Sequence, residues 1–115
     1  GGVIVNMSSI AGAIGFPGLS PYTAAKHGVV GLTKNIAVDY STQNIRANAV
    51  GPGFIKTELI DYVPEEQRKV LANVHTMERL GEVDEVAQLV VFLASPRSSF
   101  ITGAYYPVDG GMLSR

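Results

Sequence analysis

Short apolar runs alternate with longer helical stretches along this chain of 115 residues. The runs, at 3–7, 45–50 and 104–108, are too short for helices and have the composition of buried strands. The stretches at 21–42 and 83–95 have the length and spacing of helices. Strands that alternate with helices in this way predict an α/β fold, in which right-handed crossovers join parallel strands.

The ends of the parallel strands locate a binding site, because ligands of such sheets bind beyond the carboxyl ends of the strands. These ends fall at 6–9, 50–53 and 108–111. The turn G-x-G-x-x-G, which binds dinucleotide phosphates after the first strand of a complete fold, is not present in these residues. A three-stranded sheet also has bare edges. Both observations predict that an amino-terminal half of the domain is missing from this chain.

Local signals mark the ends of the first helix. Ser20 offers a hydroxyl for an N-cap, and Pro21 follows at the first helical position. Asn44 suits a left-handed residue at the helix exit. The segment 54–81 is polar and weakly periodic, which predicts short helices in a mobile insertion.

Composition excludes several classes of function. Nine basic and ten acidic residues leave a net charge of −1 without a basic stripe, so nucleic acid is not an expected partner. The longest apolar runs, such as 89–94, are far shorter than a membrane span, so we expect no membrane association. The chain has no cysteine, and neither of its two histidines has ligand-like neighbours, so we expect no metal site. We expect a cytoplasmic protein.

Tyr22 and Lys26 lie four residues apart at the start of the first helix. Four residues rotate by about 400° and rise by about 6 Å, so the two side chains share a face. A nearby ammonium and the positive end of a helix both favour a phenolate over a phenol. The pair can therefore make tyrosine a usable acid and base, although the same spacing also occurs on an ordinary helix surface.

Ser9 leaves the first strand 13 residues before Tyr22. The Gly-rich loop between them can fold back and bring the two hydroxyls together, whereas Ser8 would point the other way along a continuing strand. The serine hydroxyl would then hold a carbonyl oxygen while the tyrosine protonates it. The alternatives are a serine that caps a turn and a hydrolase nucleophile, but the required G-x-S-x-G elbow is absent from "NMSSIAG".

Five segments together resemble the short-chain dehydrogenase/reductase family. They appear in the order and spacing of the family's carboxyl-terminal half and read "NMSS", "YTAAK", "IRANAVGPGFIKT", "RLGEVDEVAQLVVFLAS" and "ITGAYYPVDGG". Within the family the likeness is to members of the 3-oxoacyl carrier-protein reductase and glucose dehydrogenase type. The resemblance implies that 1–115 is the carboxyl-terminal catalytic part of one Rossmann-like, doubly wound domain, whose cofactor-binding amino-terminal half is missing from this chain. It also implies an NAD(P)-dependent oxidoreductase that transfers a hydride between a nicotinamide and a carbonyl or secondary alcohol.

The resemblance also implies roles for single residues. Ser9 would orient the substrate carbonyl, Tyr22 would act as general acid and base, and Lys26 would support the phenolate and bind the nicotinamide ribose. Tyr22 and Lys26 thus belong to both the catalytic and the cofactor-binding set. The remaining cofactor contacts would come from Pro52, Gly53, Ile55 and Thr57. From the residues alone, the glycine permits close approach of a ligand or simply a turn, and Thr57 suits either a cofactor contact or an N-cap.

The choice between NAD and NADP stays open, because the residues that make it in the family precede this segment. The substrate also stays open among a 3-oxoacyl thioester, a steroid, a sugar and a small ketone. Alternative functions are a catalytically silent binding or scaffold chain and a sugar-nucleotide epimerase. The resemblance further implies a homodimer or homotetramer formed through the helix 21–42.

Three further side chains, those of Asn48, His75 and Met77, are not expected to take part in catalysis or binding. We expect Asn48 to be a buried polar residue that bonds neighbouring backbone, since buried amides need partners. His75 and Met77 lie in the segment that in the family closes over substrate. We expect both to be exposed to solvent rather than to line a pocket.

Overall fold

A parallel sheet forms the centre of the computed structural model, which describes all residues from 1 to 115. Strands β1 (Gly2–Met7), β2 (Ile45–Pro52) and β5 (Tyr105–Val108) pair in the order β1-β2-β5. Their register aligns Gly2 with Ile45 and Ala49 with Tyr105. The three expected strands and their parallel direction are therefore confirmed, with small shifts at their ends.

The two long helices, α1 (Ser20–Tyr40) and α3 (Val83–Ala94), are also confirmed. Asn44 has the expected left-handed conformation, with φ of 61°. The expected cap of α1 is wrong, because Ser20 is already helical and Leu19 occupies the cap position without a side-chain hydrogen bond. The amide of Thr23 instead bonds the Leu19 carbonyl at 2.8 Å, which closes the first turn one residue earlier.

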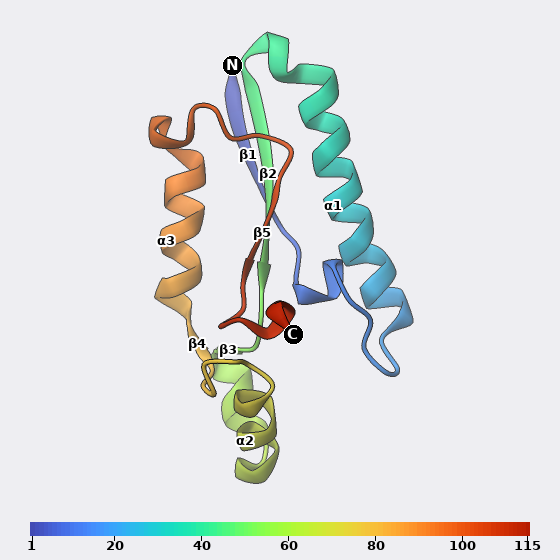
Figure 1. Cartoon of the computed structure of the whole chain (residues 1–115), viewed down its shortest axis with the longest axis vertical. Helices are drawn as coiled ribbons and strands as arrows, with labels where there is room; N and C mark the ends of the chain where they lie inside the picture. The colour runs from blue at the N-terminus through green and yellow to red at the C-terminus, as the bar shows by residue number, and fades with distance from the viewer.

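Helices α1 and α3 cover opposite faces of the sheet (Figure 1). On the α1 face, the Asn6 side chain donates to the hydroxyl of Thr33 at 3.0 Å. On the α3 face, the adjacent Val5 packs against a core formed by Val50, Val86 and Leu93. Consecutive strand residues point to opposite faces, so these contacts agree with the three layers in the picture.

The hands of the two crossovers differ. The strands step in one direction across the sheet, from β1 to β2 to β5, while α1 and α3 lie on opposite faces (Figure 1). The expectation that both crossovers are right-handed is therefore wrong. The right-handed preference arises when a strand passes directly into a helix that packs back on the sheet. The long segment between β2 and α3 removes that constraint.

This intervening segment contains a second, two-stranded parallel sheet formed by β3 (Ile55–Lys56) and β4 (Gly81–Glu82). Between them lie a 3₁₀ helix at Glu58–Tyr62 and helix α2 (Glu65–Asn73). The expected short helices are thus present, whereas the small sheet was not expected. Figure 1 shows α2 beyond the carboxyl ends of the central strands.

Polar side chains fix the connection from α3 back to β5. Asn48 is fully buried, as expected, and its amide donates to the carbonyl of Ile101 at 2.9 Å and accepts from the amide of Ala104 at 3.2 Å. The Arg46 guanidinium donates to the carbonyls of Ser95 and Ile101. None of the helices has the length and apolar character that a membrane crossing requires.

Candidate active site

Ser9 and Tyr22 line the same cavity, of about 130 Å³, beyond the carboxyl end of β1. The walls of this cavity, which we call the Ser9–Tyr22 cavity, are mostly apolar and are completed by Ile10, Phe16, Leu19, Gly53 and Phe54. The Gly-rich loop does fold back, because the 3₁₀ helix Ile10–Gly12 follows Ser9 directly. Two hydroxyls in a small apolar space are suited to holding one polar atom of an otherwise apolar ligand.

The hydroxyl of Ser9 keeps its proton available. Its Oγ accepts a hydrogen bond from the amide of Ala11 at 3.1 Å. A hydroxyl has one donor and two acceptor sites, so the O–H can still donate toward a ligand. Ser8 is engaged elsewhere, because its hydroxyl donates to the carbonyl of Lys26 at 3.0 Å.

Tyr22 and Lys26 occupy the first two turns of α1 and share a face. The Lys26 Nζ lies 5.5 Å from the centroid of the Tyr22 ring, within the range of a cation–π contact. Nζ also donates to the carbonyl of Met7 at 3.2 Å, which ties the lysine to the end of β1 and leaves two of its three N–H donors free. The Tyr22 side chain is 45% exposed, and its hydroxyl has no hydrogen-bond partner within the chain.

The segment after β2 brings Gly53 to the Ser9–Tyr22 cavity, whereas Ile55 lines a neighbouring cavity. A Cβ on Gly53 would lie 2.7 Å from the Nε2 of His75. A glycine is therefore required at this position because the His75 ring leaves no room for a side chain. The sequence alone did not reveal this reason. Pro52 ends β2 beside these residues. Thr57 stands at the N-cap position of the next 3₁₀ helix, but its side chain makes no capping hydrogen bond.

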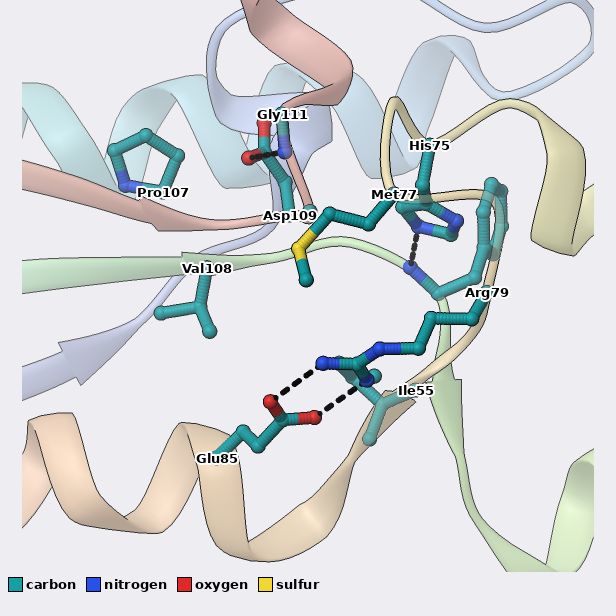
Figure 2. Close-up of a pocket in the computed structure, with 12 residues that line it drawn as sticks. Ile55, His75, Met77, Arg79, Glu85, Pro107, Val108, Asp109 and Gly111 are labelled. Carbon is teal, nitrogen blue, oxygen red and sulfur yellow. Dashed lines mark hydrogen bonds and ion pairs between the residues drawn. The ribbon is translucent and has the colours of Figure 1, made fainter.

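His75 is buried, with 2% of its surface exposed, so the expectation of an exposed histidine is wrong. Its Nε2 accepts from the amide of Phe54 at 3.0 Å, the dashed line at His75 in Figure 2. Its Nδ1 lies 3.1 Å from the carbonyl of Ala72. These partners assign the proton to Nδ1. Met77 is 59% exposed, as expected, although it also lines the neighbouring cavity.

This neighbouring cavity has a volume of about 350 Å³ and lies between the end of β5 and the start of α3. Figure 2 shows the guanidinium of Arg79 facing the carboxylate of Glu85 across it, with bonds of 2.8 and 2.9 Å. Arg79 and the amide of Glu82 bond the same carboxylate and lower the pKa of Glu85 from 4.5 to about 2. The ion pair thus holds the segment before α3 against the first turn of that helix.

Comparison with known proteins identifies the family. A family model described as "Enoyl-(Acyl carrier protein) reductase" matches residues 1–113. The chain belongs to the short-chain dehydrogenase/reductase family. Proteins of this family are NAD(P)-dependent oxidoreductases that use NAD or NADP.

Two short-chain dehydrogenase/reductases illustrate the likeness in sequence. Cyclohexanol dehydrogenase of Acinetobacter sp. (strain SE19) is 50% identical over 115 residues, which are 100% of this chain and 45% of the relative. The 3-oxoacyl-[acyl-carrier-protein] reductase FabG of Thermotoga maritima is 45% identical over 112 residues, 97% of this chain and 46% of the relative. The chain therefore spans less than half the length of these relatives.

A solved structure shows the same likeness in three dimensions. The structure described as "ElxO with NADP Bound" has a TM-score of 0.92 and 41% sequence identity, and the match covers 98% of this chain and 47% of that one. The α/β fold expected from the sequence is thereby confirmed as that of a short-chain dehydrogenase/reductase. The sequence did not reveal two features of the site: the buried His75 and the contact of Tyr105 with Ser9.

Proposed function

We propose that this chain is the carboxyl-terminal catalytic part of an enzyme that transfers a hydride between NAD(P) and a carbonyl or secondary alcohol. The observation that carries the proposal is the shared cavity of Ser9 and Tyr22, with the ammonium of Lys26 next to the tyrosine ring. A serine donor and an acid/base tyrosine with a cationic neighbour are what proton transfer to and from a substrate oxygen requires.

The donors on this side of the molecule fit a nicotinamide nucleotide. Lys26 has two free N–H donors for ribose hydroxyls, and the exposed Thr57 hydroxyl is unused by its own helix. Pro52, Gly53 and Ile55 would present backbone to the nicotinamide ring and its carboxamide. When bound, the nicotinamide supplies or accepts the hydride at the substrate carbon. The choice of NAD or NADP stays open.

The chain's own residues would handle the proton and the substrate oxygen. In reduction, Ser9 donates its O–H to the carbonyl oxygen, and Tyr22 transfers its proton to that oxygen as negative charge develops there. In oxidation, the phenolate of Tyr22 takes the proton of the alcohol. The positive charge of Lys26 stabilises the phenolate in both directions. Apolar side chains from Phe16, Leu19 and Phe54 line the cavity around these two hydroxyls.

A cyclic secondary alcohol, or the matching ketone, is our first candidate substrate. The cavity walls from Phe16, Leu19 and Phe54 suit an apolar ring with one oxygen, and a relative at 50% identity is named a cyclohexanol dehydrogenase. A 3-oxoacyl thioester is the second candidate, because another relative at 45% identity is named a 3-oxoacyl-[acyl-carrier-protein] reductase.

The test is an absorbance assay of the full-length protein with each nicotinamide cofactor. Cyclohexanol and cyclohexanone form one substrate pair, and a 3-oxobutyryl thioester forms the other. We expect turnover with one of the two classes. Cofactor binding without turnover of any carbonyl or alcohol would favour the silent scaffold instead, and cofactor-dependent inversion of a nucleotide sugar would favour the epimerase.

We also propose a homodimer or homotetramer that forms through α1. Leu32 and Val38 are large apolar residues of this helix that remain exposed to solvent. The cytoplasm is the proposed location. Sedimentation of the full-length wild type and of its Val38→Glu variant tests the proposed oligomer. An equal mass for the two proteins would contradict an interface through α1.

A further inference from the structure

We infer that Tyr105 is a positioning residue for the catalytic serine, an inference that rests on the proposed function. The hydroxyl of Tyr105 donates to the backbone carbonyl of Ser9 at 2.6 Å. The two residues are 96 positions apart in the sequence. This contact fixes the residue that carries the Ser9 hydroxyl to the last strand of the sheet.

The path of the Tyr105 side chain crosses the middle strand. Tyr105 lies on β5 and aligns with Ala49 of β2, whereas Ser9 follows β1 on the far side of β2. The phenol crosses at Gly51, where a Cβ would overlap the tyrosine hydroxyl and ring. The glycine on β2 therefore provides the space through which β5 reaches the end of β1.

Three hydrogen bonds hold Ser9. Its carbonyl accepts from the amide of Gly12 at 2.8 Å as well as from Tyr105, so both lone pairs of that oxygen are used. Its Oγ accepts from the amide of Ala11. The Gly12 and Ala11 bonds lie inside one short turn and move with it. The main chain before the turn is held to β2 by the bond from the Ser8 amide to the Val50 carbonyl at 2.8 Å. Tyr105 adds a bond from β5 to Ser9 itself, so we infer that it sets where the Ser9 hydroxyl lies relative to the Ser9–Tyr22 cavity.

The Tyr105 hydroxyl stays a donor over a wide pH range. Burial, and after it the negative charge of Asp109, raises the pKa of Tyr105 above its usual 10.0. Both effects disfavour the phenolate. The contact with Ser9 therefore persists through the neutral range and beyond.

The test compares Tyr105→Phe with Tyr106→Phe in the full-length enzyme. Tyr106 is a matched control, because it is the next residue of β5 but packs on the opposite face against the core of Val50, Val86 and Leu93. We expect Tyr105→Phe to lower kcat on the order of tenfold, the effect of one hydrogen bond on a barrier. The affinity for the cofactor should not change, and Tyr106→Phe should leave kcat within about twofold of wild type.

A double-mutant cycle separates positioning of the serine from a general structural role. In a Ser9→Ala background the backbone carbonyl remains but the hydroxyl is gone, so Tyr105→Phe should lower kcat no further. A further tenfold loss in that background would overturn the inference, and so would a normal kcat for Tyr105→Phe alone. If Tyr105→Phe does not fold, Gly51→Ala is the alternative. It leaves Tyr105 unchanged, but its methyl group displaces the phenol from the Ser9 carbonyl. A normal kcat for folded Gly51→Ala would then overturn the inference.

The outcome for Tyr22 separates a failure of the positioning role from a failure of the proposed function. If Tyr22→Phe removes turnover while Tyr105→Phe does not lower it, the positioning role fails and the proposed function stands. If Tyr22→Phe and Ser9→Ala both retain normal turnover, the proposed function fails, and the inference fails with it.

Discussion

The ammonium of Lys26 lies 5.5 Å from the ring centroid of Tyr22 and is bonded at the same time to the carbonyl of Met7. The lysine thus connects the helix that carries the tyrosine to the strand that leads to Ser9. Its charge is held near the phenol by the fold, without an acidic partner that would neutralise it.

Tyr22→Phe in the full-length enzyme should lower turnover by about 10²–10³-fold, because proton transfer by a positioned side chain contributes about 10²–10⁴-fold. Cofactor affinity, measured by fluorescence titration, should be almost unchanged. Tyr40→Phe is the control, since Tyr40 ends α1 and does not line the Ser9–Tyr22 cavity. Turnover of the Tyr22 variant close to that of the control would remove the acid/base role.

Lys26→Ala should weaken cofactor binding and also lower turnover, because the lysine is proposed to bind the ribose and to stabilise the phenolate. Lys34→Ala is the control, because Lys34 lies on the same helix and its side chain forms no hydrogen bond or ion pair. Intact cofactor affinity together with unchanged turnover would mean that Lys26 contributes only surface charge.

Gly53→Ala should destabilise the protein by about 1–3 kcal/mol, because the new methyl group would press on the His75 ring. Both nitrogens of that ring already have partners, so it cannot easily move away. Gly15→Ala is the control, since a Cβ there has nothing within 4 Å. Equal urea midpoints for the two variants would show that the His75 ring can adjust.

Glu85→Gln should change how stability depends on pH. The pKa of Glu85 falls from 4.5 to about 2 in the folded chain, first through its bond with Arg79. A lowered carboxyl pKa contributes stability above pH 4.5, and this contribution disappears as the pH falls toward 2. The difference in Tm between wild type and Glu85→Gln should therefore narrow over that interval. Glu66 forms no ion pair. The difference in Tm between wild type and Glu66→Gln should therefore not narrow over the same interval.

Residues 1–115 expressed alone should show no cofactor-dependent activity and should be partly unfolded or aggregated. Only 17 of the 115 residues are buried, which is a small core for a chain of this length. Val3 and Ile4 of β1 are exposed, and so are Val91 and Phe100. Circular dichroism and titration with NADH and NADPH provide the measurement. A cooperatively folded monomer with micromolar cofactor affinity would contradict this prediction.

The helices were predictable because each is long enough to show a helical period, and the central strands because each is an apolar run of strand length. β3 and β4 were not, since two residues of strand carry no periodicity. The difference in hand between the crossovers depends on where the segment 53–82 leads the chain, which local patterns do not encode. Asn44 was predictable, because asparagine tolerates a left-handed conformation, but Glu78 adopts φ of 54° without any such signal.

The candidate site was predictable where its residues are close in sequence. Tyr22 and Lys26 are one turn apart, and Ser9 is joined to them by a short loop. His75 was misjudged because its partner, the amide of Phe54, is 21 residues away. The contact of Tyr105 with Ser9 spans almost the whole chain, and only the packing of three strands brings these residues together.

The way in which β3 pairs with β4 has a consequence for how such proteins diversify. The pairing brings the chain back to nearly the place where it left the central sheet, with Ile55 beside Gly81. Helix α2 and the residues around it therefore form a loop whose two ends lie side by side. A change in the length of this loop need not disturb β2 or α3. Evolution or a protein engineer can exchange this segment for another of different size and apolar character. Ligand selectivity would then change while the residues that we propose for proton transfer, on α1 and after β1, stay in place.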